Sequence, residues 1–350
     1  ALLRGGRGDT LLWEAHQDTV SGAGMTVQPF AAKVREDRVY GRGACDVKGP
    51  LAAMLVALAS AAPEPARNRP NVLMACTVNE ECGFSGARAL ADIWRREPAD
   101  QSPISLIPTG GLTLDELRSL RPTAAIIAEP TELNVVVAHR GVVRWQCVVH
   151  GRAAHSSRPE DGANAIYAMA PIVGLIDRYH RDVLATRPAD PQCGPPTACV
   201  TTIQGGTGAN TVPDRAIIDV DRRLTPAEEP AAAYEELVSY LSNETSAGEC
   251  RVEHLSPWMQ SRGLTSADNR RWAERLSSMA AEVGINSQTI GVPFGTNAAS
   301  IAAAGIPSVV FGPGSIAQAH TADEWIAIDE LQRAVSLFHR IATGAISADG

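Results

Sequence analysis

Two adjacent carboxylates, Glu80 and Glu81, follow an apolar run in the segment NVLMACTVNEECGFSG. Two like charges at a predicted strand end repel each other, so the pair needs a compensating positive charge. Successive residues of an extended chain point in different directions, and the two side chains therefore serve different purposes. One carboxylate can bind a metal ion while its neighbour acts as general base on water, and a nearby dication removes the electrostatic objection to the pair.

Four other residues with nitrogen or oxygen donors stand at or just beyond predicted strands: His16, Asp46, Glu129 and His320. With Glu81 they make five potential ligands. In open α/β sheets, ligands gather at the carboxyl ends of the strands, so these donors are expected to converge. Two divalent ions about 3.5–4 Å apart would suit the set if one carboxylate bridges them.

Each of these signals also has an ordinary explanation when it is taken alone. Asp18 lies two residues after His16, hence on the same face of a strand, where its carboxylate is placed to accept the second ring N–H of a metal-bound histidine. The same H-x-D pattern is typical of a surface turn. Asp46 stands before an apolar helix, where an aspartate is more often an N-cap.

Short apolar runs alternate with Ala/Leu-rich helical stretches over residues 10–136, with a Gly/Pro-rich loop at 101–112. This alternation predicts an α/β sheet with much parallel pairing. From His139 the pattern becomes period-two, and the predicted order β-α-β-β-α-β is ferredoxin-like. The α/β pattern returns after about residue 256. We therefore expect an α/β domain of residues 1–138 and 256–350, interrupted by an inserted α+β domain of residues 139–255.

Composition excludes several classes of function. The 350 residues are 45% hydrophobic and carry a formal net charge of -8, which argues against a nucleic-acid partner. No stretch is long and apolar enough to predict a membrane span, and no signal peptide is visible. The seven cysteines form no C-x-x-C pair and favour buried thiols in a reducing cytoplasm. Because the chain opens on Ala1 and soon reaches a strand, we expect an N-terminal segment to be missing.

A series of motifs runs along nearly the whole chain: HQDTV, YGRGACDVKG, NEECGFSG, AEPT, HRG, GRAAHSSRPEDGANAI, GGTGANTVPD, VDRRLTP, PFGTNAASIAAAGIPSVVFGPGS and QAHTADEW. In this order they resemble the co-catalytic zinc hydrolase family of acetylornithine deacetylase, succinyl-diaminopimelate desuccinylase, aminoacylase and carboxypeptidase G2, peptidase family M20. The resemblance implies a zinc-peptidase-like α/β catalytic domain with an inserted ferredoxin-like lid and dimerisation domain.

The resemblance also implies a metal-binding role for each donor. Asp46 would bridge two divalent metal ions. His16 and Glu129 would complete one site, and Glu81 and His320 the other. Zinc is the first expectation, although the same donors suit cobalt or manganese.

Catalytic and substrate-binding roles follow by the same resemblance. Glu80 matches the general base and Asp18 the residue that orients the histidine at position 16. His155 matches a histidine that polarises the scissile carbonyl, often across a dimer, which implies a homodimer. The implied substrate contacts are Asn210, Thr296, Gly312, Gly314 and Arg223.

Two positions leave the substrate contacts open. Arg223 matches the arginine that binds the substrate carboxylate, but Arg222 is adjacent and is the alternative. Asn297 stands where the family often has aspartate, which puts contacts on that loop in doubt without touching a ligand.

The sequence thus predicts a metal-dependent amidohydrolase that removes a short acyl group from a small N-acyl-L-amino acid. Glu at position 129 goes in this family with deacylases and carboxypeptidases. A succinyl-diaminopimelate desuccinylase, or a dipeptidase or carboxypeptidase, is the alternative within the family. A non-catalytic metal-binding scaffold and a regulatory dimer built on the lid are the alternatives from other classes. The scaffold should have lost a ligand or the general base, and all five ligands and Glu80 are present.

Overall fold

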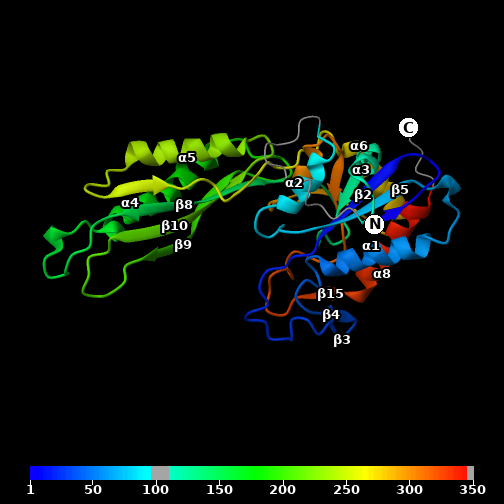
Figure 1. Ribbon diagram of the computed structural model, residues 1–350, viewed down its shortest axis with the longest axis horizontal. Helices are drawn as coiled ribbons and strands as arrows, with labels where there is room; N and C mark the ends of the chain where they lie inside the picture. The colour runs from blue at the N-terminus through cyan, green and yellow to red at the C-terminus, as the bar shows by residue number, and fades with distance from the viewer. Residues whose placement is uncertain (96–109, 345–350) are drawn as a thin grey trace. The chain divides into compact units, whose positions relative to one another are not determined.

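A computed structural model describes residues 1–95 and 110–344 of the chain (Figure 1). The chain forms two compact units. The first contains Ala1–Ala138, Leu264–Gly291 and Thr296–Gly350, and the second contains His139–Gly263 and Val292–Gly295. An α/β unit interrupted by an α+β unit is the fold class predicted from the sequence. The loop predicted for residues 101–112 lies, up to residue 109, outside the described residues.

A seven-stranded sheet forms the centre of the first unit, in the order β1-β5-β2-β6-β14-β7-β13. Its strands are β1 (Leu2–Leu3), β2 (Thr10–His16), β5 (Asn71–Thr77), β6 (Ala124–Ile127), β7 (Val135–His139), β13 (Thr289–Val292) and β14 (Ser308–Val310). The four strands β5, β2, β6 and β14 pair in parallel, whereas β1 and β7 pair antiparallel to their neighbours. The parallel strands therefore end at one common edge.

The central strands of this sheet are buried on both faces, as is typical of parallel sheets, because helices pack against them. The helices of the first unit are α1 (Lys48–Ala61), α2 (Ser85–Asp92), α3 (Leu114–Ser119), α6 (Arg270–Glu282), α7 (Ala298–Ala302) and α8 (Ile328–Thr343), with a 3₁₀ turn at Ala66–Asn68. Helices α1 and α8 lie side by side (Figure 1). On β2, the ring of Trp13 packs against Phe338 of α8, with ring centroids 5.1 Å apart.

A separate three-stranded sheet, in the order β15-β4-β3, accompanies the main sheet of the first unit. Its strands are β3 (Lys33–Arg35), β4 (Arg38–Tyr40) and β15 (Trp325–Ala327). Pairing of β4 with β15 brings the segment before α1 next to the segment before α8. The sequence pattern did not predict these strands, because each is short and the first is exposed.

The second unit is built on an antiparallel sheet in the order β11-β8-β10-β9, with β12 also paired to β8. Its elements are β8 (Gly141–His150), α4 (Ala165–Arg178), β9 (Thr197–Gly205), β10 (Arg215–Leu224), α5 (Pro230–Glu244), β11 (Arg251–His254) and β12 (Met259–Ser261). Short turns of helix occur at Pro159–Asp161, Tyr179–Val183 and Leu184–Thr186. The β-α-β-β-α-β order is the one predicted.

The core of the second unit follows the predicted period-two pattern. On β8, Val143, Trp145, Cys147 and Val149 are fully buried and join a cluster with residues of α4 and α5. Most of the alternate residues of β8 and β10 are polar or charged, with Val142, Val148 and Ile217 as exceptions, so one face of the sheet is apolar and covered by helices and the other is mainly polar.

Among the helices that the structure describes, none combines the length and apolar character needed to cross a bilayer. The seven cysteines are free thiols. The expectation that most of them are buried is wrong: Cys76, Cys82 and Cys199 are exposed.

Candidate metal centre

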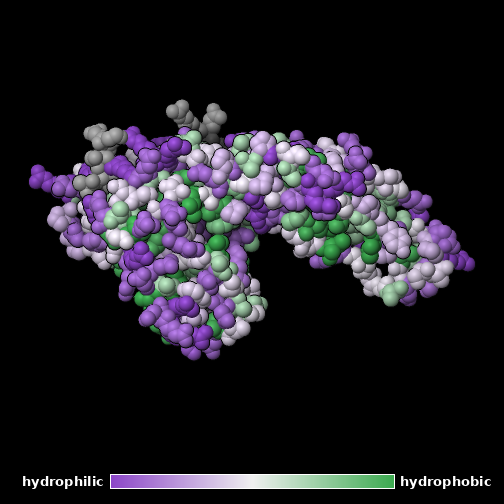
Figure 2. Space-filling model, turned by 180° about the vertical axis from the view of Figure 1, so that it is seen from behind, coloured by the Kyte–Doolittle hydropathy of each residue, from purple (hydrophilic) through white to green (hydrophobic). Residues whose placement is uncertain are grey.

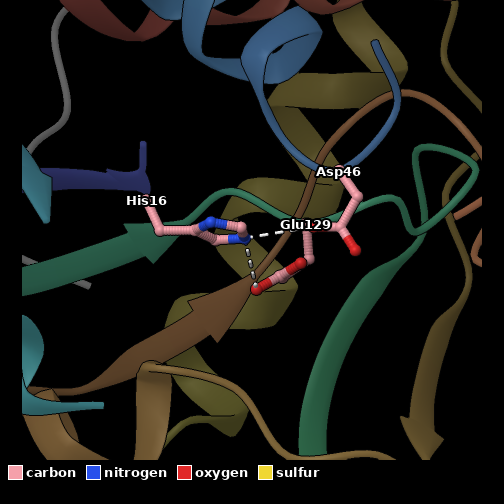
Figure 3. Close-up of side chains that lie close together, drawn as sticks. All are labelled: His16, Asp46 and Glu129. Carbon is pink, nitrogen blue, oxygen red and sulfur yellow. Dashed lines mark hydrogen bonds and ion pairs between the residues drawn. The ribbon is translucent and has the colours of Figure 1, made fainter. Parts of the chain in front are cut away.

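His16 is the last residue of β2 and is 1% exposed. Its Nδ1 lies 2.9 Å from the backbone oxygen of Asp18, which can only accept a hydrogen bond, while Nε2 faces the neighbouring carboxylates. Nε2 lies 3.0 Å from Oδ1 of Asp46 and 4.0 Å from Oε1 of Glu129 (Figure 3). Glu129 follows β6, so two neighbouring parallel strands supply two of these three donors.

A second group of donors consists of Asp46, Glu81 and His320. Nε2 of His320 lies 3.2 Å from Oδ2 of Asp46 and 3.2 Å from Oε2 of Glu81. Glu81 comes from the segment after β5, and its Oε1 accepts the backbone N–H of Val20 at 3.2 Å. In each group the ligand atoms lie within 4.8 Å of one another.

Asp46 belongs to both groups and turns a different oxygen toward each histidine. It lies in the turn between β4 and α1, not at the end of a main-sheet strand as expected, and His320 likewise lies in a loop well beyond β14. Asp46 is also not a helix cap, because the N-cap position of α1 is Val47 and no side chain caps it. The ordinary explanation of this aspartate is therefore excluded.

The protein's own cationic groups do not balance the carboxylates gathered around the two histidines of this centre. Burial, with the nearby Asp46 and Glu80, raises the pKa of Glu129 well above its usual range. Burial, opposed by His16 and reinforced by Asp46 and Glu81, raises the pKa of Glu80 to about 8. Burial disfavours a charged His16, yet its hydrogen bond to Asp46 and the surrounding carboxylates raise its pKa to about 11.

The same imbalance fits divalent metal ions. Asp46 keeps its charge despite burial because both histidines donate to it, and its pKa falls to about 2. Hydrogen bonds to Asp46 and Glu81 raise the pKa of His320 to about 10. Protons on the histidines therefore hold the carboxylates together, and dications in the same places would replace them. Imidazole nitrogens and carboxylate oxygens are the donors that zinc and similar ions use.

Asp18 contacts this centre in a different way from the one expected. Its backbone oxygen, not its carboxylate, is the atom nearest to Nδ1 of His16, since Oδ1 lies 3.7 Å away. Its carboxylate oxygen Oδ2 accepts the backbone N–H of Glu81 at 3.1 Å. Asp18 thus contacts both ligand groups, one through its main chain and one through its side chain.

A buried polar group behind His16 was missed by the sequence analysis. Glu14, on the same face of β2, is fully buried, and its Oε1 accepts from the Thr77 hydroxyl and, at 3.0 Å, from Nδ2 of Asn297. Burial raises the pKa of Glu14. This contact explains why asparagine stands at position 297, where the family often has aspartate. An aspartate there would place a second carboxylate against that of Glu14. The signal in the sequence was an acidic residue inside an otherwise apolar strand.

The predicted substrate contacts of the first unit are held by backbone hydrogen bonds and close packing. Thr296 is 1% exposed, and its hydroxyl accepts the backbone N–H of Ala298 at 3.1 Å. A Cβ on Gly312 would lie 2.6 Å from the backbone oxygen of Glu129. Gly314 has φ +92°, and a Cβ there would lie 2.6 Å from Sγ of Cys45. The two glycines are thus required by close packing.

In the second unit, the structure brings His155 and Asn210 together. Residue 155 forms an isolated bridge with Thr211, and the backbone oxygen of Asn210 accepts the N–H of Ser156 at 2.9 Å. Nδ1 of His155 lies 2.8 Å from the Ser157 hydroxyl. The His155 side chain is exposed, so its ring remains accessible.

The two adjacent arginines of β10 point to opposite faces of the sheet. The Arg222 side chain is 0% exposed and pairs with Glu228 beside the helices. Arg223 lies on the polar face, 25% exposed, and its Nε donates to Asp221 at 2.7 Å. Of the two, only Arg223 presents its guanidinium to solvent.

Two groups of histidine and carboxylate donors that share an aspartate, in an α/β unit, are the arrangement expected of a centre for two metal ions. The profile of peptidase family M20/M25/M40 matches residues 12–344, and the chain belongs to this family. Membership and the two donor groups make the protein a hydrolase of amide bonds that binds divalent metal.

Individual relatives are similar over most of the chain. The acetylornithine deacetylase of Myxococcus xanthus is 28% identical over 347 residues, covering 97% of this chain and 81% of that protein. The N-acetyl-L-citrulline deacetylase of Xanthomonas campestris pv. campestris is 29% identical over 338 residues, covering 95% and 81%. A solved M20 metallo-carboxypeptidase of Sulfolobus solfataricus superimposes with a TM-score of 0.72 at 19% identity, covering 98% and 86%.

Proposed function

We propose that this protein removes a short acyl group from an N-acyl-L-amino acid, using two divalent ions that share Asp46. The observation that carries the proposal is the position of the Asp46 carboxylate, with Oδ1 3.0 Å from Nε2 of His16 and Oδ2 3.2 Å from Nε2 of His320. Glu129 would complete the first site and Glu81 the second. The two similar relatives named as deacetylases support this substrate class over a peptide.

When bound, such ions polarise a carbonyl and lower the pKa of water. Glu80, whose charge interacts with those of His16 and Asp46, would act as the general base: it would accept a proton from the attacking water and pass it to the leaving amine nitrogen. Water attacks the amide carbon, the C–N bond breaks, and a carboxylic acid and an amine leave.

The second unit supplies groups for the rest of the substrate. Arg223 would bind the α-carboxylate, since its guanidinium is accessible and an arginine fork matches a carboxylate. His155 would donate a hydrogen bond to the scissile carbonyl oxygen, with Asn210 beside it. The glycines at 312 and 314 and Thr296 would form the wall of the site, mostly through their backbones.

We also propose a homodimer that forms through the second unit. Arg223 lies eight residues from Arg215 along β10, which at about 3.3 Å per residue is about 26 Å. The loop with His155 and Asn210 joins the sheet at the Arg215 end. If Arg223 and His155 touch one small substrate, they therefore come from different subunits.

An exposed edge strand offers the surface for this dimer. β9 pairs only with β10 within the described part of the sheet, and most of its residues are exposed. Ile203 on β9 is 61% exposed and Tyr167 at the start of α4 is 78% exposed. Figure 2 shows hydrophobic residues gathered between hydrophilic ones on the face that it draws of this unit. Such an edge pairs readily with a second copy.

The experiment compares initial rates of the metal-reconstituted protein on four substrates: N-acetyl-L-ornithine, N-acetyl-L-citrulline, N-succinyl-diaminopimelate and a dipeptide. Reconstitution with Zn²⁺, Co²⁺ and Mn²⁺ in parallel identifies the ion that supports the fastest rate; Zn²⁺ is our expectation. We expect one acetylated substrate to be preferred and chelation to abolish its hydrolysis.

Preference for the succinylated substrate or the dipeptide would keep the metal centre but move the substrate class to the alternative. Protein that binds no metal and hydrolyses none of the four substrates would refute the proposal.

We also infer a cytoplasmic location from the free cysteines, because a reducing compartment keeps thiols reduced.

A further inference from the structure

Glu324 is a buried carboxylate that lies directly before β15 and is 0% exposed. Its Oε1 accepts the backbone N–H groups of Cys45 at 2.9 Å and Asp46 at 3.0 Å. Its Oε2 accepts the backbone N–H of Gly43 at 3.0 Å and the Nη1 of Arg42 at 2.7 Å. One side chain therefore binds the backbone of the whole turn that carries the shared aspartate.

The partners of Glu324 distinguish it from the carboxylates that face the ions. Both its oxygens are occupied by protein donors, and its charge is compensated by Arg42, which is itself 6% exposed. Arg42 is held in turn by the backbone oxygens of Ser21 at 3.2 Å and Thr321 at 3.3 Å. Glu324 thus has neither a free oxygen nor an uncompensated charge to offer to a metal ion.

The effect of Glu324 on the metal centre follows from what it fixes. The backbone N–H groups of Cys45 and Asp46 donate to the same oxygen of Glu324. This fixes the backbone nitrogen of Asp46, which is bonded to the Cα atom that carries its side chain. That carboxylate must present one oxygen to each ion site. The loop that carries Glu324 also carries His320, so one segment supplies a ligand and fixes the backbone of the shared ligand.

We propose that Glu324 is a positioning residue of the metal centre: it holds the turn of residues 42–46 so that both oxygens of Asp46 face the ion sites before any ion binds. This inference rests on the proposed function. Groups that orient metal ligands typically change affinity 10- to 100-fold when they are replaced.

The test is a calorimetric titration of metal-free protein with Co²⁺, followed in parallel by the visible absorption of the bound ion. Glu324→Gln keeps the size of the side chain but offers one acceptor oxygen and turns an NH₂ group toward N–H donors. We expect the affinity for Co²⁺ to fall about 10- to 100-fold. Glu324→Asp keeps the charge and both acceptors at a shorter reach, and a smaller loss is expected.

Glu228→Gln in the second unit is the matched control. Glu228 also accepts a backbone N–H, that of Thr225 at 2.7 Å, and pairs with a buried arginine. Its replacement should lower the thermal unfolding temperature but leave the Co²⁺ affinity unchanged. Thermal unfolding of every metal-free variant separates loss of stability from loss of metal binding.

Several outcomes would overturn the inference. If wild-type protein binds no Co²⁺, the metal centre itself fails and the proposed function fails with it. If wild-type protein binds Co²⁺ and Glu324→Gln binds it as tightly, only the role of Glu324 fails. The role also fails if Glu228→Gln loses as much affinity, or if neither Glu324 variant folds, because Glu324 would then act on stability in general.

Discussion

On the polar face of the second unit, Asp221 lies between two arginines, with Nε of Arg144 at 2.6 Å and Nε of Arg223 at 2.7 Å. In the first unit, the buried carboxylates of Asp46, in the turn before α1, and of Glu129, after β6, have histidines as their ion-pair partners. An arginine keeps its charge in a protein, whereas a histidine can give up its proton.

This difference separates a carboxylate that is paired within the fold, Asp221, from carboxylates that are suited to bind a metal ion, Asp46 and Glu129. Asp221 is paired with two permanent cations and needs no further partner. The first unit concentrates carboxylates around two histidines, His16 and His320. Burial, together with the neighbouring carboxylates, raises the pKa of Glu80 and Glu129. An excess of buried carboxylate that only a proton or a cation can relieve is the physical signature of the metal centre.

The largest expected effect is that of Glu80→Gln. The amide cannot accept the proton of water, so kcat should fall about 10²- to 10⁴-fold while metal content stays that of wild type. Initial rates and metal analysis measure the two quantities. Glu253→Gln, in an exposed pair of the second unit, is the control and should keep full activity. Full activity of Glu80→Gln under metal saturation would remove Glu80 from the mechanism.

Replacing each of the two adjacent arginines sharpens the comparison within the second unit. Arg223→Met should raise KM roughly ten- to hundred-fold, since a hydrogen bond to a charged group contributes about 1.5–3 kcal/mol. Arg222→Met should leave KM unchanged but destabilise the protein by about 1.5–3 kcal/mol, because it removes the hydrogen bonds of a buried guanidinium to Glu228 and to the backbone oxygen of Arg223. Kinetics and denaturant unfolding of both variants test this. The reverse pattern would show that Arg222 binds the substrate.

A pH-dependent stability is expected from His139 at the start of the second unit. Burial lowers its pKa to about 4, whereas a histidine in the unfolded chain has a pKa near 6.5. The unfolded chain therefore binds a proton that the folded chain does not, so stability is lost as the pH falls from 6.5 to 4, by about 3 kcal/mol.

The measurement for His139 is the free energy of unfolding of wild type and His139→Gln at several pH values. The difference between the two proteins isolates this residue from the other titrating groups. Parallel pH profiles of the two proteins would show that His139 does not titrate as expected.

The smallest expected effect is that of the cap of α4. Asn164 accepts the backbone N–H groups of Ile166 at 3.0 Å and Tyr167 at 3.2 Å. Asn164→Ala should cost about 1 kcal/mol of stability. Co²⁺ affinity should not change, because the cap lies in the unit without the ions. A loss of affinity in this variant would show that the two units are energetically coupled.

Elements with a strong local pattern were predicted well from the sequence. The strand over residues 10–16, the helix before Ala61 and the ferredoxin-like order all follow from apolar periodicity, which depends on neighbours in the chain. Strands β3, β4 and β15 were missed because each has three residues. Their pairing is set by contacts between segments that are far apart in the chain.

The candidate site divides in the same way. The types and order of the donors indicated metal chemistry, and the position of Glu81 after an apolar strand placed it at the sheet edge. Glu324 was missed because its partners in the turn at 43–46 lie 278 to 281 residues away, so no local pattern marks it. The face to which Arg222 points was equally hidden, since a strand shows which residues share a face but not which face the helices cover.

Residue type and periodicity are local properties, so the amino-acid sequence predicts which chemical groups are available and most of the strands and helices that carry them. Only the packing of remote segments turned the two oxygens of Asp46 toward different histidines, brought Glu324 to its turn, and left Asp46 and Glu129 with histidines where Asp221 has arginines. These are questions of distance and burial, and both arise only when remote segments pack together.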